Sequence, residues 1–406
     1  MTKAVPGWLV PVAAIFILQT TSSFLARFIP IIAPAVSGEF GWSGSSIGYL
    51  SAANSLGGLA ILVAGSALIK QVGGMRILQL SLLLGAASMA LFLQSSIGLA
   101  LAACFVMGLS NGAANPAGSE VLQRYSPPDK RNLIFSIKQA GVPLGGVIAG
   151  LAIPVVVLAA GWRVALFACA LLIVLPSMLT WRISTQLDKA NTRAGWHFGM
   201  PGLQSLHTLR VPLQSLTLNR GLLNISIVGS LFAISQSCWF TFTVVFLVDK
   251  LEFSLGKAGA VFAVMQLGGV LGRIALGWLA DRLHSATATL TMAAVVSAVT
   301  TVLLGISSTA WPLWCIVMLA FVAGCSAASW NGVQIAEVAR RSPADLIPET
   351  AAGSSILISV VNMVVPTSFA AFVAFSGRYD YAFGAAGVCT LLVLVFLPRD
   401  KQAAAL

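Results

Sequence analysis

The chain has 406 residues, of which 58% are hydrophobic and only 9% are charged. A soluble domain has about 25% charged and about 45–50% apolar residues, so this composition excludes a soluble globular protein and indicates one that lies in lipid. The net charge of +11 does not indicate a nucleic-acid partner, because the basic residues collect in the termini and in alternate loops on one side. By the positive-inside rule we expect both termini and the long middle loop in the cytoplasm, and the protein in the inner (plasma) membrane.

Twelve apolar runs are long enough to cross about 30 Å of hydrocarbon. They lack the alternation of β-strands, and a lipid-facing backbone must satisfy its own hydrogen bonds, so we expect an all-α multi-pass protein and exclude a membrane β-barrel. The expected spans are 8–36, 45–69, 77–95, 97–120, 132–159, 162–181, 221–248, 256–280, 286–307, 311–336, 349–375 and 381–397.

A polar, basic segment separates the sixth run from the seventh. It is rich in Gly, Pro, Ser and Thr, and it has one acid, Asp188. This predicts an N-terminal six-helix bundle at 1–182, a cytoplasmic linker at 183–220 and a C-terminal six-helix bundle at 221–406. The linker could hold a short amphipathic helix on the membrane surface.

The second half reads as a diverged copy of the first. The stretch 43–73 recurs without a gap as 254–284, so that Leu56-Gly57-Gly58 matches Leu267-Gly268-Gly269. Glu120 and Arg124 are likewise echoed by Glu337 and Arg341. Duplication in so apolar a chain indicates a transporter made of two membrane bundles with a substrate site between them.

One loop carries a family signature. Residues 277–282, Gly-Trp-Leu-Ala-Asp-Arg, match the G-x-L-a-D-R pattern that follows the second helix of a half in the major facilitator superfamily, and the chain resembles that superfamily over nearly its whole length. The resemblance implies two pseudo-symmetric bundles that work by alternating access. The matching stretch of the first half, 66–76, is degraded, because Lys70 stands where an acid is usual.

Five residues are candidates for gating. Gly277 would let two helices approach closely, while Asp281, beside Arg282, would accept hydrogen bonds from a neighbouring helix end or arginine; the alternative is a solvated turn. Gly141 and Pro143 belong to a Gly/Pro-rich face of the fifth helix that resembles a facilitator motif, where tight packing or a hinge is sufficient explanation.

Three basic residues fall inside apolar spans, where a charge costs about 2.5–3.5 kcal/mol. They are Arg27, Arg273 and Lys138, and every acid lies in a loop, a tail or a cytoplasmic helix end. An anionic substrate would complete the charge, because a guanidinium holds a carboxylate through two parallel hydrogen bonds. Arg273 could instead bond helix-end carbonyls, Arg27 could snorkel to the outer surface and Lys138 to the cytoplasm.

The resemblance adds to this interpretation. Arg27 is placed similarly to the first-helix arginine of facilitator transporters of organic anions, and Arg273 to the eighth-helix arginine of monocarboxylate transporters. Gly269 stands where those proteins have an acid one turn before the arginine, so carboxylate-based proton coupling is in doubt.

Polar and aromatic residues of the expected cavity helices complete the candidate site. Gln236, Trp239, Trp330, Asn331 and Asn54 are the candidates, although interhelical hydrogen bonding would explain the polar ones equally well. Two tryptophans would suit an anion with an apolar or aromatic body.

We therefore expect a secondary active transporter of a small organic anion, a monocarboxylate, by symport with protons or by anion exchange. Glu120 and Glu337 are possible proton carriers. We expect a monomer in membrane lipid, with no cofactor, metal or catalytic residue, because no His, Cys or acid cluster has catalytic spacing. An exporter of drugs or other metabolites is the alternative, and a transporter-like receptor would need a larger soluble domain.

Overall fold

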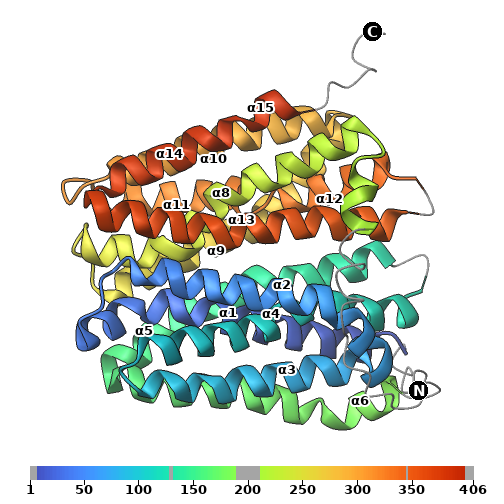
Figure 1. Ribbon diagram of the computed structural model, residues 1–406, viewed down its shortest axis with the longest axis horizontal. Helices are drawn as coiled ribbons and strands as arrows, with labels where there is room; N and C mark the ends of the chain where they lie inside the picture. Colours follow the sequence, from blue (N-terminus) through green and yellow to red (C-terminus); the bar gives the residue numbers. More distant parts are fainter. Residues whose placement is uncertain (1–6, 128–130, 189–210, 344–345, 398–406) are drawn as a thin grey trace, which may run out of the picture. The chain divides into compact units, whose positions relative to one another are not determined.

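The computed structural model describes residues 7–127, 131–188, 211–343 and 346–397. Within these ranges the chain forms helices joined by turns, and no strand (Figure 1). It divides into two compact units, Met1–Val36 with Ala53–Ser205 and Ser37–Ala52 with Leu206–Leu406. The predicted linker, 183–220, falls partly on 189–210, outside the described residues, and the predicted domain bounds stay a prediction.

The first unit holds the helices of the first half, apart from the end of α1 and the start of α2. These are α1 (Leu9–Phe40), α2 (Ser46–Val72), α3 (Gly74–Ser88), the 3-10 helix η1 (Met89–Leu93), α4 (Ile97–Tyr125), α5 (Arg131–Leu179) and α6 (Trp181–Leu187). In this unit α3 packs on α4 and α5.

The second unit holds the helices of the second half. These are α8 (Arg220–Asp249), α9 (Leu255–Arg282), α10 (Ala286–Ile306), α11 (Leu313–Ala327), α12 (Asn331–Arg341), α13 (Ile347–Ser376), α14 (Tyr379–Leu391) and α15 (Val393–Phe396). Here α9 packs on α11, α10 on α14 and α8 on α13.

The expected membrane spans are all helical. Ten described helices are long and apolar enough to cross a membrane. One of them, Ile137–Leu179, covers both the fifth and the sixth expected spans, since α5 runs on through a kink at Gly161, where φ is 82°. A shorter apolar helix, Ser46–Leu62, covers the second. The prediction of an all-α membrane protein is confirmed.

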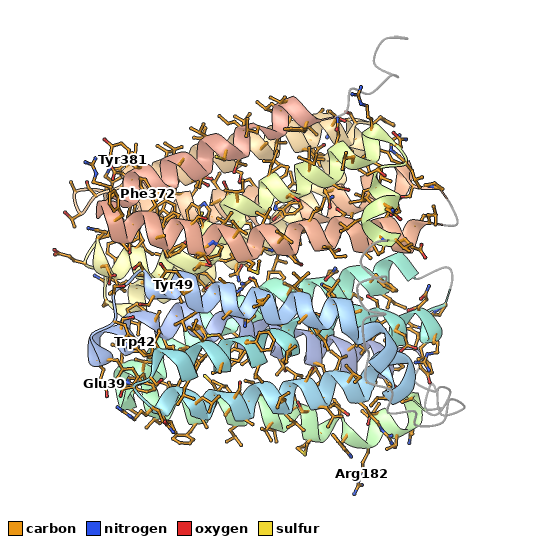
Figure 2. The ribbon with its side chains drawn as sticks, viewed as in Figure 1. Glu39, Trp42, Tyr49, Arg182, Phe372 and Tyr381 are labelled. Carbon is orange, nitrogen blue, oxygen red and sulfur yellow. The ribbon has the colours of Figure 1, made fainter. Side chains whose placement is uncertain are left out.

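Large apolar side chains cover outward-facing parts of these helices. Phe375 is 93% exposed, and Phe372 and Tyr381 are exposed on α13 and α14 (Figure 2). So much exposed apolar surface would drive a soluble protein to aggregate, but hydrocarbon chains cover it in a membrane.

The sequence duplication recurs in the packing. In each unit, small residues let the second helix and the fourth span of that half touch backbone to backbone, and a Cβ added at any of these glycines would overlap a carbonyl. The overlaps form two equivalent sets: Gly57 with Phe105 and Gly268 with Phe321, and Gly108 with Asn54 and Gly324 with Met265. Close backbone approach of this kind increases dispersion contact where lipid offers no hydrophobic driving force between helices.

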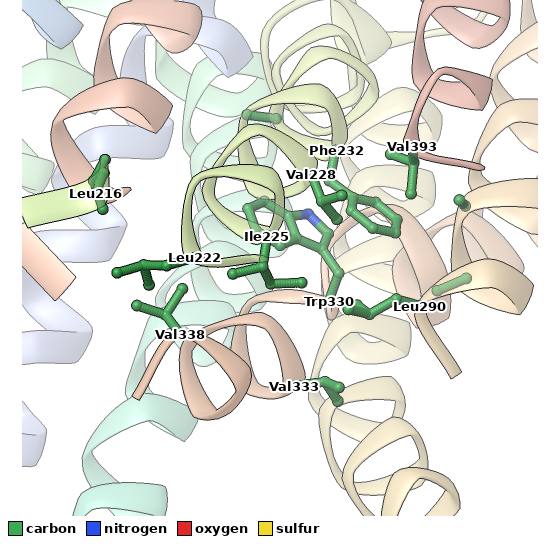
Figure 3. Close-up of a cluster of buried hydrophobic side chains, with 13 residues drawn as sticks. Leu216, Leu222, Ile225, Val228, Phe232, Leu290, Trp330, Val333, Val338 and Val393 are labelled. Carbon is green, nitrogen blue, oxygen red and sulfur yellow. The ribbon is translucent and has the colours of Figure 1, made fainter. Parts of the chain in front are cut away.

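The second unit has a packed apolar core around α8 and α12. Trp330 stacks on Phe232 with ring centroids 5.3 Å apart, and both side chains are fully buried (Figure 3). Leu290 of α10 and Val393 of α15 close the cluster. This core fixes the position of α12 against α8.

The start of α3 is capped from another helix. The carboxylate of Asp188, just after α6, accepts hydrogen bonds from the backbone N–H groups of Met75 (3.3 Å) and Arg76 (3.0 Å). Gly73 precedes the helix at φ 99°, and a Cβ there would collide with Asp188. Burial raises the pKa of Asp188 above its ordinary 3.8, although the hydrogen bonds from Arg76 and Met75 lower it.

The glycine contacts generate a stability prediction. Gly324→Ala should lower the free energy of unfolding by about 1–3 kcal/mol, because the new methyl group overlaps the Met265 carbonyl. Gly384→Ala in α14 is the control, since nothing lies within 4 Å of its added Cβ. Thermal unfolding of the detergent-purified protein measures both, and equal stability of the two variants would contradict the packing argument.

The Asp188 cap generates a second prediction. Asp188→Ala should cost about 0.5–2 kcal/mol, because two helix-end N–H groups lose their acceptor. Because the folded pKa is raised, the folded protein binds more protons between pH 3.8 and that pKa, so the stability of wild type relative to Asp188→Asn should fall as pH rises through this window. Unfolding midpoints over a pH series test this, and a flat or rising difference would refute it.

Candidate functional site

The tenth span has an irregular turn near its middle. Helix α11 ends at Ala327 and α12 begins at Asn331, but Ala328 and Trp330 keep right-handed helical torsion angles, so that Leu313–Arg341 forms a single span. The single O–H of Ser329 is shared between the Gly324 carbonyl (2.7 Å) and the Gly269 carbonyl of α9 (3.1 Å). Irregular backbone within a membrane span needs hydrogen-bond partners from neighbouring side chains, and polar side chains therefore collect beside it.

Arg273 lies at this irregular turn. It is half-buried on α9, and its Nη2 donates to the Ala328 carbonyl at 3.5 Å. The contact is favourable because the C-terminal end of α11 carries partial negative charge. The sequence offered bonding to helix-end carbonyls as one of two interpretations of this arginine, and the structure shows one such contact, at the carbonyl that follows α11.

Two further candidates meet beside the same irregular turn. Gln236 of α8 donates from Nε2 to Oδ1 of Asn331, the first residue of α12, at 3.4 Å. Asn331 follows Ala328 by less than one helical turn. The second unit therefore brings a guanidinium and two carboxamide groups to the irregular turn, a set that offers several hydrogen-bond donors.

The side chains of the two candidate tryptophans are buried and do not line an exposed cavity surface in this structure. Trp239 is buried, and its Nε1 donates to Thr301 Oγ1 of α10 at 3.1 Å. Trp330 is buried in the core against Phe232 (Figure 3). The indoles pack inside the second unit because burial of their large apolar faces is more favourable there than at a polar surface.

The candidates of the first unit are spread over α1, α2 and α4. Arg27 is half-buried on α1, next to the fully buried Phe28. Asn54 donates from Nδ2 to the Cys104 carbonyl of α4 at 3.3 Å, which is the interhelical bond offered as its alternative interpretation. Asn111 accepts a hydrogen bond from Ser22 at 3.4 Å.

Lys138 does not snorkel to the cytoplasm. Its side chain is only 1% exposed, and the ammonium donates to the Asn115 carbonyl (2.9 Å) and to Ser119 Oγ (2.8 Å), both on α4. Gly118 leaves the space that the lysine occupies, because a Cβ there would lie 3.2 Å from Cε. A buried charge with hydrogen-bond partners is therefore built into the first unit.

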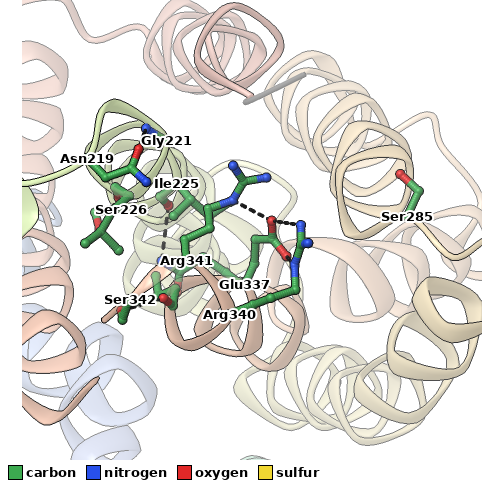
Figure 4. A network of polar contacts seen from close by, with 12 residues as sticks. Asn219, Gly221, Ile225, Ser226, Ser285, Glu337, Arg340, Arg341 and Ser342 are labelled. Atoms are coloured by element: carbon green, nitrogen blue, oxygen red, sulfur yellow. Dashed lines mark hydrogen bonds and ion pairs between the residues drawn. The ribbon is translucent and has the colours of Figure 1, made fainter. Parts of the chain in front are cut away.

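The echoed acids of the two halves form matching ion pairs. Glu120 pairs with Arg124 at 2.5 Å, and Glu337 pairs with Arg341 at 2.6 Å and with Arg340 at 2.6 Å (Figure 4). The duplication therefore preserved an interaction as well as residue types. Both carboxylates, which the sequence offered as proton carriers, are engaged with arginines.

The gating candidates differ in their surroundings. A Cβ at Gly277 would meet nothing within 4 Å, so the close helix approach expected there is not made in this structure. Asp281 is exposed, and the guanidinium of Arg282 lies over the Trp278 ring at 5.0 Å. Their gating role stays a prediction.

Tight packing is present at the other candidate face. A Cβ at Gly141 would lie 2.9 Å from Thr20 Oγ1 of α1, and Pro143 lies within α5. The packing interpretation is sufficient for Gly141, and a hinge at Pro143 stays a prediction.

Sequence reasoning missed the irregular turn itself and Ser329. A signal was present, because Asn331-Gly332 is a turn dipeptide inside an apolar run. The same dipeptide at Asn111-Gly112 lies within continuous α4, so the signal alone does not decide. In the described part of the chain, no three His, Cys, Asp or Glu residues gather as metal ligands.

Comparison with known proteins agrees with this architecture. The family model for the Major Facilitator Superfamily matches residues 12–366. The chain is 28% identical over 301 residues to the uncharacterized MFS-type transporter Rv2994 of Mycobacterium tuberculosis (strain ATCC 25618 / H37Rv), covering 70% of this chain and 62% of that protein. It is 25% identical over 276 residues to the 4-hydroxybenzoate transporter PcaK of Pseudomonas aeruginosa, covering 62% of each. The matches therefore span less than two thirds of either relative.

A solved structure shares the fold. A bacterial homologue of the human lysosomal transporter Spinster, inward-facing and unoccupied, superposes with a TM-score of 0.72 at 14% identity, covering 97% of this chain and 95% of that one. The family match, the duplicated helices and the multi-pass composition agree, and the chain belongs to the major facilitator superfamily.

Proposed function

We propose that the protein is a secondary active transporter of a small organic anion, a monocarboxylate, that works by alternating access. The observation that carries this proposal is the guanidinium of Arg273, which donates to the Ala328 carbonyl at the irregular turn of the tenth span, three residues before Asn331, the partner of Gln236. A guanidinium can hold a carboxylate through two parallel hydrogen bonds, and the carboxamides can orient the rest of the molecule.

The first half has a membrane-span arginine of its own, Arg27. It sits within the first span, where a charge is costly unless it serves a function. When the two halves are aligned at the offset of the sequence repeat, Arg27 aligns with Cys238 and Arg273 aligns with Leu62. Neither arginine is therefore part of the duplicated pattern. We propose that both arginines contact the anion.

The relatives support an organic anion. PcaK is named for 4-hydroxybenzoate, a molecule with one carboxylate on an aromatic body. Proton symport and anion exchange are the two modes of coupling under this proposal, in a multi-pass protein of the inner membrane with both termini in the cytoplasm. The Asp281 loop, with Gly277 and Arg282, and the Gly141–Pro143 face would change contacts between states.

The rival function is export of drugs or other metabolites. A cation exporter would need a membrane-buried acid, and the acids of this sequence lie in loops, tails and helix ends. Substrate charge therefore separates the two functions.

Arginine substitution tests the proposal. In proteoliposomes, wild type should take up labelled organic acids, and Arg27→Ala or Arg273→Ala should reduce uptake efficiency by at least about 30-fold, since removing one partner of a buried charge pair costs roughly 2–5 kcal/mol. Arg273→Lys should restore only part of it, because lysine keeps the charge and loses the planar fork.

Arg163→Ala is the matched control, because this arginine is exposed and lies over the Trp162 ring. It should transport like wild type. Transport of cations without anions, or full anion uptake by Arg27→Ala, would overturn the proposed function.

A further inference from the structure

Lys138 is a buried charge that the substrate site does not use. Its ammonium donates to one backbone carbonyl, that of Asn115, and to one hydroxyl, that of Ser119, and it is 1% exposed. Both acceptors are neutral. The described structure therefore surrounds this cation with polar groups that do not cancel its charge.

This arrangement offers hydrogen-bond partners to both a charged and a neutral amine. The Asn115 carbonyl accepts an N–H bond from either form. A hydroxyl can accept from an ammonium and can rotate to donate to the lone pair of a neutral amine. Proton release at Nζ therefore leaves no hydrogen bond of the pair unmade, which removes the main cost of titrating a buried group.

The charged residues on the helices packed around α5 bind other partners or lie at other positions along their helices. On α4, Glu120 pairs with Arg124, and after α6, Asp188 caps α3. The remaining charged residues of α1, α3, α5 and α6 whose side chains the structure describes are Arg27, Glu39, Arg76, Arg163 and Arg182. Among the described contacts, no ion pair involves Lys138.

In the second half, the equivalent pair of helices is joined by neutral side chains. There the fourth span meets the fifth through Gln334 of α12, whose Nε2 donates to Ser354 Oγ of α13 at 3.0 Å. Because neutral groups are sufficient to hold this helix pair in the second unit, packing alone does not require a lysine in the first.

We propose that Lys138 is the proton-binding group that couples anion transport to the pH gradient; this inference rests on the proposed function. Protonation forms one Nζ–H bond with a proton from water. Release breaks that bond, returns the proton to water and leaves the electron pair on Nζ, where the Ser119 hydroxyl donates to it. An anion in the same membrane protein favours the ammonium form electrostatically, so anion and proton move together.

The alternative proton carriers are less suited. Glu120 and Glu337 are bound to arginines at 2.5 and 2.6 Å, and protonating either one would break a charge-assisted hydrogen bond. Lys138 changes its charge without breaking an ion pair.

Fixed-charge variants test the proposal in proteoliposomes, with a labelled acid that wild type transports as the probe. Lys138→Arg keeps the charge permanently, and Lys138→Met removes it permanently. We expect both to lose accumulation driven by an inward proton gradient while they retain exchange of labelled for unlabelled acid across the membrane. Lys257→Met, at an exposed lysine of α9, should behave like wild type in both assays.

The two assays separate the possible failures. Gradient-driven accumulation by either fixed-charge variant would overturn the role of Lys138, as would loss of driven uptake and exchange together in a folded variant, which indicates structure alone. Wild type that exchanges anions but ignores the pH gradient would overturn the inference and leave the proposed function standing. Wild type that transports no organic acid would overturn both.

Ser119→Ala tests the same site without touching the lysine. The charge-assisted bond from the ammonium to this hydroxyl is stronger than the bond that the neutral amine accepts, so its loss destabilises the charged form more, and the midpoint of the pH profile of driven uptake should move down by about one unit. An unchanged midpoint would overturn the proposal even if the Lys138 variants fail to fold.

Discussion

The structure depends on the need to pair every backbone polar group inside hydrocarbon. Helices meet this need by themselves, which is why the described chain is helical and why its spans are apolar. The irregular turn between α11 and α12 is the informative exception, because its carbonyls require partners from elsewhere. The Ser329 hydroxyl and the Arg273 guanidinium supply hydrogen bonds at Gly324 and Ala328. A polar site in the membrane thus begins with an irregular piece of backbone.

Association of the helices follows a second constraint. Lipid chains are as apolar as leucine, so burial of apolar side chains gains little, and close contact between backbones matters more. Both units make this backbone contact at equivalent positions, with Gly108 against Asn54 in the first unit and Gly324 against Met265 in the second. The duplication is therefore visible as repeated contacts, and the scaffold it produces leaves the unmatched basic residues free to differ between halves.

Polar groups inside this scaffold divide into two kinds. Asn54 and Trp239 make hydrogen bonds that join neighbouring helices. Arg273 and Lys138 bring charge into the membrane span, where neutral hydrogen-bonding groups would have cost less. The second kind is where we place substrate binding and proton coupling.

The sequence by itself determined the spans, the duplication and the three basic residues inside apolar runs, because hydropathy, repeat spacing and charge are local properties. It also predicted the echo of Glu120 by Glu337, which the structure turned into matching ion pairs. Only the tertiary structure decided that Asn331-Gly332 follows an irregular turn while Asn111-Gly112 lies in a regular helix, that Trp330 enters a packed core, and that Lys138 turns toward α4. The reason is physical: the direction of a side chain and the continuity of a helix depend on which neighbours supply hydrogen bonds and space, and those neighbours are distant in sequence.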